Sequence, residues 1–486
     1  MKKYYDMVII GAGPAGLTLA HCCSNLGLNI LVIDREKSIG GCHRVIRTQD
    51  GLFTEHSPRI YLSNYVNVFH ILSELGLKQD DVFTAYKYNM FDVIQKLLPF
   101  VQIHEIFTFI IAFLIYIFYP NYGHSTNLKD FCESKQFSYA LMDKIDRICR
   151  VIDGTGMNKY SLNKILGVMN STSSILQPKE PLDKSLFERW QTYLELRNVD
   201  FALGSEVSYI HYNKTLKRID YIILDNKYTI HVNKLMLAIP PANISKILKN
   251  NKDITDAFGD YSEFHEWSEE TEYDEYIAIT YHFKQKVNLP DVNGITLDTD
   301  WGIVVIALSD YMRHIEDNYK TVLSICITLP NAKSSKTGKT ANQCTKEELF
   351  TEVYRQLKSS IYPKLPADYY AILNPNQYYQ NNQWNNHDEA YFNTVGTQYI
   401  PFRSNNIPNL YNVGTQNGKS YIDYTTMESA VSNAMVLSYQ LYPQLRQRYY
   451  IRKGLLIRDI IQFIMITLLF MVIVWYMVKI VRNISR

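Results

Sequence analysis

Residues 7–16, with the sequence MVIIGAGPAG, decide the fold of this chain. Four apolar residues predict a buried strand, and the glycines after it have the spacing of a turn that holds a dinucleotide. Gly11 lets the chain turn off the strand, Gly13 lets backbone N–H groups approach a pyrophosphate, and Gly16 lets the next helix pack close to the sheet. With a helix expected over residues 17–26, the segment predicts a strand–turn–helix unit that binds a dinucleotide.

A second predicted strand, residues 29–33, ends at an acidic residue. The Asp34 carboxylate stands where dinucleotide-binding folds hold a ribose, whose hydroxyl groups it can bind. A further pair of glycines, Gly40 and Gly41, follows shortly after it. A fold that binds only NAD does not need this second glycine turn.

Two later parts of the chain agree with this interpretation. Residues 204–207 (GSEV) begin a run of alternating strands that closes at residues 235–241 (LMLAIPP). Residues 407–414 (IPNLYNVG) predict one more strand, and residues 427–431 (MESAV) predict the start of a helix. Taken alone, the middle run is also typical of an ordinary antiparallel meander.

Together these segments resemble the FAD-binding oxidoreductases of the flavin amine oxidase, phytoene desaturase and protoporphyrinogen oxidase superfamily. The resemblance implies that the backbone near Val207 holds the adenine. It also implies that the helix beginning at Met427 faces the flavin pyrimidine, where a helix N-terminus stabilises the negative charge of a reduced flavin. The cofactor-binding residues that it implies are Gly11, Gly13, Pro14, Ala15, Gly16, Asp34, Arg35, Gly40, Gly41, Arg44, Val207, Gly414, Thr415 and Met427.

Several positions depart from the superfamily's pattern. The residue after the returning strand's glycine is usually acidic and holds the ribityl chain, whereas this chain has Thr415. An arginine often follows the second glycine pair directly, whereas Arg44 comes two positions late. Monoamine oxidases carry a tyrosine where this chain has Thr426. They also carry a cysteine that is bonded to the flavin, and residues 388–396 of this chain contain no cysteine to match it. FAD is therefore expected to bind non-covalently, and a simple amine substrate becomes less secure.

Three residues are candidates for catalysis or substrate binding. Many superfamily members place a lysine near flavin N5, and Lys284 occupies a comparable place, with a solvated strand-end lysine as the alternative. UDP-galactopyranose mutases have a loop similar to residues 53–59, with a histidine where Arg59 stands. The loop predicts either that His56 and Arg59 bind an anionic substrate group or that they form salt bridges with Glu55.

The composition excludes several classes of protein. A chain of 486 residues can form two large lobes, and a net charge of +2 gives no sign of nucleic-acid binding. The seven cysteines are scattered without metal-ligand spacing, so we expect no metal site and a reducing compartment. We also expect no secretory signal, because the first strand begins too early.

The end of the chain predicts a membrane anchor. Only Gln462 and Thr467 interrupt an apolar run over residues 460–478, which is long enough to cross a bilayer. Basic residues are denser before this run than after it: Arg446, Arg448, Arg452, Lys453 and Arg458 precede it, and Lys479, Arg482 and Arg486 follow it. The positive-inside rule therefore predicts a single-pass, tail-anchored protein with a cytoplasmic catalytic body. A buried core helix is the alternative.

A second apolar stretch, residues 106–119, is too short for an ordinary membrane span. It predicts a helix of the substrate lobe that is either buried or dips into the membrane. A helix that dips would turn the entrance of the site towards lipid, which would suit an apolar substrate.

We expect an α/β fold with a Rossmann-like FAD-binding domain, a discontinuous α+β substrate domain and a C-terminal transmembrane helix. The expected ranges are 1–90, 200–250 and 400–440 for the FAD-binding domain, 91–199 and 251–399 for the substrate domain, 441–459 for a basic connector and 460–478 for the transmembrane helix. The leading hypothesis is an FAD-dependent oxidase that dehydrogenates a C–N or C–C bond of a small molecule. Two alternatives stay open: a redox-neutral flavin mutase of the UDP-galactopyranose mutase type, and a non-catalytic binding protein such as the Rab GDP-dissociation inhibitors.

Overall fold

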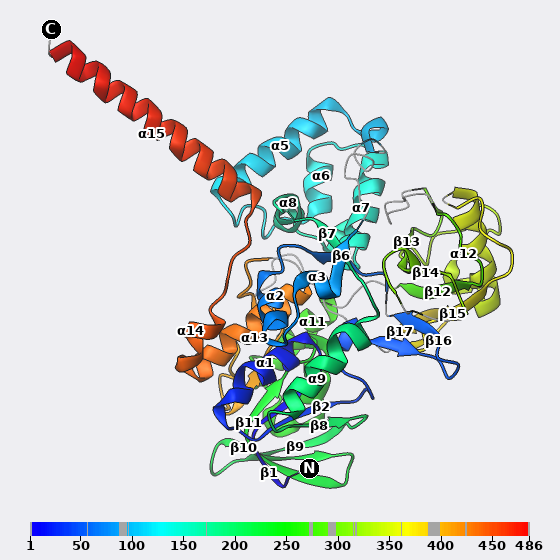
Figure 1. Cartoon of the computed structure of the whole chain (residues 1–486), viewed down its shortest axis with the longest axis vertical. Helices are drawn as coiled ribbons and strands as arrows, with labels where there is room; N and C mark the ends of the chain where they lie inside the picture. The colour runs from blue at the N-terminus through cyan, green and yellow to red at the C-terminus, as the bar shows by residue number, and fades with distance from the viewer. Residues whose placement is uncertain are drawn as a thin grey trace.

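The computed structural model describes residues 2–484 except 56, 87–94, 96, 172, 272–275, 290–297, 314, 316–317, 361, 387–398 and 423–424. His56 and residues 388–396, which entered the predictions above, therefore lie outside the described residues. Figure 1 shows a large sheet covered by helices, a smaller sheet beside it, a group of helices at one end, and a long C-terminal helix that projects away from the body.

The large sheet has seven strands and is built from distant parts of the chain. Its order is β8-β2-β1-β11-β10-β9, with β18 beside β11. The strands β8, β2, β1, β11 and β18 are paired in parallel, and β11, β10 and β9 form an antiparallel meander. Their bounds are Tyr4–Ile10 (β1), Ile30–Asp34 (β2), Val199–Leu203 (β8), Val207–Asn213 (β9), Arg218–Leu224 (β10), Tyr228–Leu237 (β11) and Leu410–Asn412 (β18). The predicted Rossmann-like α/β fold is confirmed.

Helices cover both faces of this sheet, because alternate side chains of the central strand point to opposite faces. Met7 and Ile9 of β1 belong to a core shared with one set of helices, and Val8 and Ile10 belong to a second core on the other face. The first set comprises α1 (Pro14–Cys23), α2 (Val66–Glu74), α9 (Glu188–Glu195) and α13 (Met427–Leu441), and the second comprises α10 (Pro241–Asn250) and α11 (Tyr261–Glu270). The burial of both faces explains why β1 is an almost continuous apolar run.

The smaller sheet is antiparallel, with the order β13-β14-β12-β15. Its strands are β12 (Ile277–Phe283), β13 (Ile303–Ala307), β14 (Thr321–Ile327) and β15 (Tyr370–Leu373), and α12 (Lys346–Ser360) packs against them. Short elements complete the connections: β3 (Val45–Arg47), β4 (Phe53–Glu55), β5 (Tyr61–Leu62), β6 (Phe83–Ala85), β7 (Ile175–Pro178), β16 (Gln377–Gln380), β17 (Gln383–Asn386), α3 (Gln79–Val82) and α14 (Arg446–Tyr449).

The division into two domains stays a prediction. Two helices from the ranges expected for the substrate domain pack on the large sheet instead. Both α9 and α11 lie in ranges expected for the substrate domain, but their apolar residues join the two cores of the large sheet. The reason is local: α9 leads directly into β8, and α11 follows α10 on the same face.

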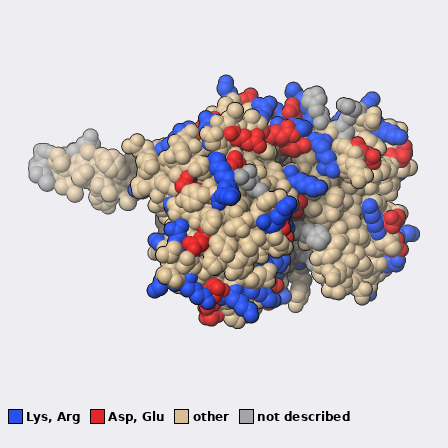
Figure 2. All heavy atoms as spheres, turned by 90° about the horizontal axis from the view of Figure 1, so that it is seen from below, with Lys and Arg blue, Asp and Glu red and all other residues tan. Residues whose placement is uncertain are grey.

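The helical group contains α5 (Ile103–Phe118), α6 (Leu128–Ser134), α7 (Tyr139–Asp153) and α8 (Leu162–Met169). Residues 106–119 lie largely in α5, which is only partly buried: one side packs into the core of the helical group, and a row of apolar side chains on the other side is exposed. The C-terminal helix α15 (Ile457–Ile484) is longer than the predicted segment, and residues 457–481 are long and apolar enough to cross a membrane. In Figure 2 it projects from the body as a stalk without visible charged atoms, whereas charged side chains are scattered over the body.

Candidate functional site

A cavity of about 1150 Å³ connects the carboxyl edge of the large sheet with the helical group. This volume is above the range of roughly 300–1000 Å³ that is usual for small-molecule sites, and a dinucleotide with a substrate needs such space. The lining comes from the first glycine turn, residues 41–44 and 57–60, the start of α13, and the helices α5, α7 and α8. Segments that are remote in sequence therefore share one cavity.

Most of the predicted site residues line this cavity. They are Gly11, Gly13, Pro14, Ala15, Asp34, Arg35, Gly41, Arg44, Arg59, Val207, Gly414, Thr415 and Met427. Gly16 and Gly40 lie behind the wall, where a side chain would collide with Gly11 O and with the ring of Phe187. Their binding roles stay predictions.

The glycine turn has the geometry that its sequence requires. Gly11 has φ of +110°, and a Cβ there would lie 2.3 Å from the carbonyl oxygen of Ala238, so only glycine fits. A Cβ at Gly13 would meet no atom nearer than Gly41 Cα, at 3.7 Å. Gly13 is also the N-cap of α1 and makes no side-chain capping bond, which leaves the helix N-terminus open towards the cavity. Such an N-terminus suits an anion.

Two charged side chains are held at the same end of the cavity. Asp34 Oδ2 accepts a hydrogen bond from the Ala12 amide at 2.7 Å, so the end of β2 is tied to the glycine turn. Arg44 is buried, and its Nη1 donates to the Gly41 carbonyl oxygen at 3.2 Å. Its guanidinium also lies 3.5 Å from a carboxylate oxygen of Glu36. The late register of Arg44 therefore still brings its charge to the cavity wall.

The two residues of the Met-Glu motif at the start of α13 point in different directions. Met427 lines the cavity, whereas Glu428 is fully buried on the opposite side. The Glu428 carboxylate accepts hydrogen bonds from the Val68 amide at 2.9 Å and from Asn67 Nδ2 at 2.5 Å, and so caps the N-terminus of α2. Burial raises the pKa of Glu428 to about 8, because it outweighs the hydrogen bonds that lower it. The glutamate therefore serves the fold.

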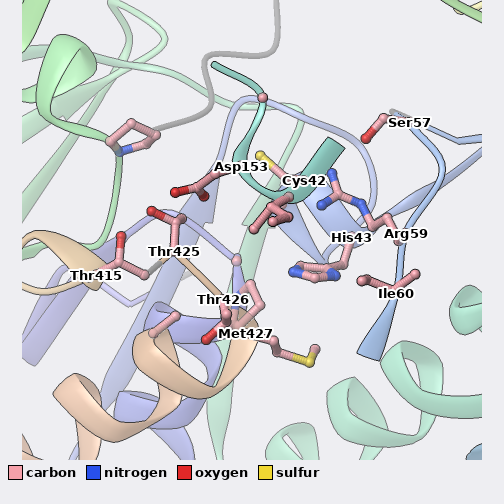
Figure 3. A pocket seen from close by; sticks show the side chains of 18 of the residues that line it. Cys42, His43, Ser57, Arg59, Ile60, Asp153, Thr415, Thr425, Thr426 and Met427 are labelled. Atoms are coloured by element: carbon pink, nitrogen blue, oxygen red, sulfur yellow. The ribbon is translucent and has the colours of Figure 1, made fainter. Parts of the chain in front are cut away.

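Of the three candidates for catalysis or substrate binding, Arg59 lines the cavity, Lys284 does not, and His56 lies outside the described residues. Figure 3 shows Arg59 and His43 on one side of the cavity and Thr415 and Thr426 on the other. Lys284 is exposed at the end of β12, where the chain leaves the sheet, and it is not among the residues that line the cavity. Its place near flavin N5 stays a prediction. Burial raises the pKa of Glu55, next in the chain to the undescribed His56, to about 7, although Ser324 and the charge of Arg59 lower it.

Two features of the cavity were not predicted from the sequence. Thr425 Oγ1 is buried in the wall with no hydrogen-bond partner among the described residues. Asp153, the last residue of α7, lines the cavity and forms a buried ion pair with Lys164 of α8. Burial raises the pKa of Asp153 in spite of Lys164. An aspartate at a helix C-terminus is unfavourable with the helix dipole, so the sequence could have marked Asp153 as unusual. Its pairing with Lys164 could not be predicted in the same way, because Lys164 lies on another helix.

Residues 9–75 match the family described as NAD(P)-binding Rossmann-like domain. The whole fold is similar to putrescine oxidase (TM-score 0.62, 13% identity, covering 90% of this chain and 99% of that one). It is also similar to a putative protoporphyrinogen oxidase from Exiguobacterium sp. 255-15 (TM-score 0.57, 16% identity, covering 91% and 99%). These likenesses show that the chain has the fold of these oxidase structures, with a Rossmann-like unit at residues 9–75.

Two curated proteins match this chain in sequence, each over a short segment. The 15-cis-phytoene desaturase of an Oncidium hybrid cultivar is 33% identical over 76 residues, which are 16% of this chain and 13% of that protein. The digeranylgeranylglycerophospholipid reductase of Methanosarcina acetivorans is 35% identical over 68 residues, which are 14% of this chain and 15% of that protein. The matches therefore span less than a sixth of either relative.

The cavity wall fits FAD, which the superfamily implies. The uncapped N-terminus of α1 suits a pyrophosphate, the open space over Gly13 admits it, and Asp34 lies at the edge where a ribose would bind. The unsatisfied hydroxyl of Thr425 stands beside the N-terminus of α13, so a polar group of a bound ring would complete its hydrogen bonding.

Proposed function

We propose that the chain is a membrane-anchored, FAD-dependent oxidoreductase that dehydrogenates a C–N or C–C bond of an apolar small molecule. One observation carries the proposal: the cavity joins the glycine turn to an apolar arm. The apolar arm is formed by Ile106, Phe109, Ile110, Leu141, Ile145, Ile148, Ile165, Val168 and Met169. A dinucleotide at one end and an apolar molecule at the other would meet near the start of α13.

The residues of the chain position the two molecules and exclude water. The open N-terminus of α1 and the charge of Arg44 would hold the FAD phosphates, and Asp34 its ribose. These residues would hold FAD, which would supply a hydride acceptor that oxygen could reoxidise with release of peroxide. The apolar arm orients the substrate chain, and its side chains keep water from the reacting end. FAD is proposed to bind non-covalently.

We further propose that α15 anchors the protein, with the body in the cytoplasm. The support is the exposed apolar surface of α15 and the basic residues that precede it. The proposed partners are thus a small-molecule substrate and a lipid bilayer, and the balanced charge favours no nucleic acid.

The mutase and the binding protein remain alternatives, and one preparation separates the three. The full chain is purified in detergent, and its visible spectrum is recorded before and after acid precipitation. We expect flavin absorbance that passes into the supernatant, and peroxide release with a member of a panel of apolar amines and polyenes. Absence of flavin would leave the binding protein. Flavin that turns over only after chemical reduction, without oxygen consumption, would favour the mutase.

A further inference from the structure

The helix α5 presents different faces to the cavity and to the outside. Ile106, Phe109 and Ile110 line the apolar arm. Phe107 and Ile111 lie one turn apart on the outer side, where they are 59% and 56% exposed and are not among the residues that line this cavity. With other apolar residues they form an exposed stripe, the α5 outer face: Ile103, Phe107, Ile111, Leu114 and Phe118. A stripe of this kind normally marks a contact with a partner or a membrane.

The cavity reaches the surface beside this face. Ile106 and Ile110 of α5 and Met169 of α8 line the cavity and are also 40%, 48% and 44% exposed. These three side chains, here called the apolar mouth, line the cavity and are also exposed at the surface. The apolar arm therefore ends at an opening whose rim is apolar.

The start of α15 is attached to the rim of this mouth. The amides of Ile457 and Arg458 donate to the backbone and side-chain oxygens of Asn170, which follows Met169, at 2.9 and 2.8 Å. One turn further along, Gln462 Nε2 donates to the carbonyl oxygen of Ile117 in α5 at 2.7 Å. Figure 1 shows α5 beside the base of α15. A bilayer crossed by α15 would begin next to the mouth.

We propose that the α5 outer face lies in the surface of the bilayer that α15 crosses, and that the apolar mouth opens into its lipid. With 16 residues and a rise of about 1.5 Å per residue, α5 is about 24 Å long, which is too short to span the hydrocarbon core and suits an interfacial helix. Lipid is the occupant because α5 is joined to an exposed apolar helix that itself needs a bilayer.

The substrate class follows from the position of the mouth. A molecule that reaches the cavity through an apolar rim in contact with lipid must itself be dissolved in the bilayer. The substrate would then be a long apolar molecule that enters from the membrane, and water-soluble amines would be poor substrates. This step rests on the proposed oxidoreductase function, whereas the lipid contact rests on the proposed anchoring by α15 and not on the reaction.

Photo-crosslinking tests the contact without any need for turnover. The full chain carries benzoylphenylalanine in place of Ile111, Phe109 or, as a control, Leu216, an equally exposed apolar residue of the distant β9–β10 turn. Each protein is reconstituted into phosphatidylcholine vesicles and irradiated. We expect a mass increase of one phospholipid at Ile111 and at Phe109, and none at Leu216. Phe107 serves as a second outer position if the Ile111 variant is poorly folded.

Three results would overturn the proposal. A crosslinked dimer at Ile111 would show that a second copy covers the α5 outer face, and a yield no higher than at Leu216 would show that water covers it. A lipid adduct at Ile111 without one at Phe109 would show that the mouth is closed to lipid. A protein without flavin that still forms both lipid adducts would contradict the proposed oxidoreductase function but support the lipid contact. Failure of the function can therefore be told from failure of the contact.

Discussion

At the scale of single residues, the three glycines of the first turn have different tasks. Gly11 and Gly16 are required by the fold, because a Cβ atom at either position would lie 2.3 Å or less from a backbone carbonyl oxygen. Gly13 has an ordinary backbone conformation and room for a methyl group. We therefore expect Gly13→Ala to fold normally but to place that methyl in the path of the pyrophosphate.

The expected result for Gly13→Ala is about tenfold weaker flavin retention, or about 1.4 kcal/mol, with unchanged thermal unfolding of the flavin-free protein. Flavin content after dialysis measures it. Gly167→Ala is the matched control, because its nearest neighbour, Tyr116 Oη at 3.6 Å, leaves similar room but lies away from the turn. Equal flavin content in both variants would contradict a pyrophosphate site at Gly13.

Glu428 gives a prediction about the pH dependence of stability. Its pKa rises from 4.5 to about 8 on folding, so the folded state binds the proton more tightly than the unfolded state. Its contribution is therefore fully present below pH 4.5 and is lost as the pH rises through about 8, at up to about 1.4 kcal/mol per pKa unit. Glu428→Gln should lack this loss. The measurement is chemical unfolding in detergent at several pH values.

Glu74 supplies the control of opposite sign. Burial works to raise its pKa, but hydrogen bonds from His21, Arg448 and Tyr449 prevail and lower it to about 2. The stability from Glu74 is present above pH 4.5 and is lost as the pH falls towards about 2, a window that Glu74→Gln should abolish. Parallel pH curves for the wild type and Glu428→Gln would disprove the buried proton.

At the scale of elements, local patterns were predictable and long-range partners were not. The strand–turn–helix at residues 7–16 and the start of α13 at Met427 follow from glycine spacing and apolar periodicity, which act within a few residues. The place of Lys284 depends on where β12 sits relative to the other sheet, which no local pattern encodes. The pairing of Asp153 with Lys164 likewise depends on the packing of α7 against α8.

One buried carboxylate connects α5 to α7. Glu105 is fully buried and accepts hydrogen bonds from the amide of Gln102 at 2.5 Å and of Ser138 at 2.6 Å, the N-cap residues of α5 and α7. We expect Glu105→Ala to cost about 2 kcal/mol, because two amides lose their acceptor. Hydrogen exchange should quicken in the first turns of both helices.

Glu133→Ala is the control for this element, because Glu133 is exposed and its carboxylate forms a 3.8 Å ion pair with Lys129 on α6. Such a surface pair contributes less than about 1 kcal/mol, so exchange in α5 and α7 should not change. Faster exchange confined to α7 would mean that α5 is held by its apolar contacts and needs no cap.

At the scale of the whole molecule, the helical group joins the cavity to α15. Three remote segments build the end of the cavity at the glycine turn, the helical group builds its apolar arm, and α15 begins at the mouth of that arm. The sequence predicted an anchor and a short apolar helix separately. Their contact came only with the structure, because Asn170 and Gln462 carry no pattern that pairs helices remote in sequence.

The anchor predicts both attachment and orientation. Replacing Leu468 and Leu469 with lysine puts two charges in the middle of α15, each at a cost of about 3 kcal/mol for membrane insertion. We expect the wild type to resist alkaline extraction from membranes and the double variant to be released, with Leu216→Lys as the control on the exposed body.

A tag after Arg486 should be protected from protease in sealed vesicles while the body is digested. Digestion of the tag with the body intact would reverse the orientation. If the double variant stays on the membrane, α15 is not what holds the protein there. The α5 outer face, which is also apolar and exposed, would then be the attachment.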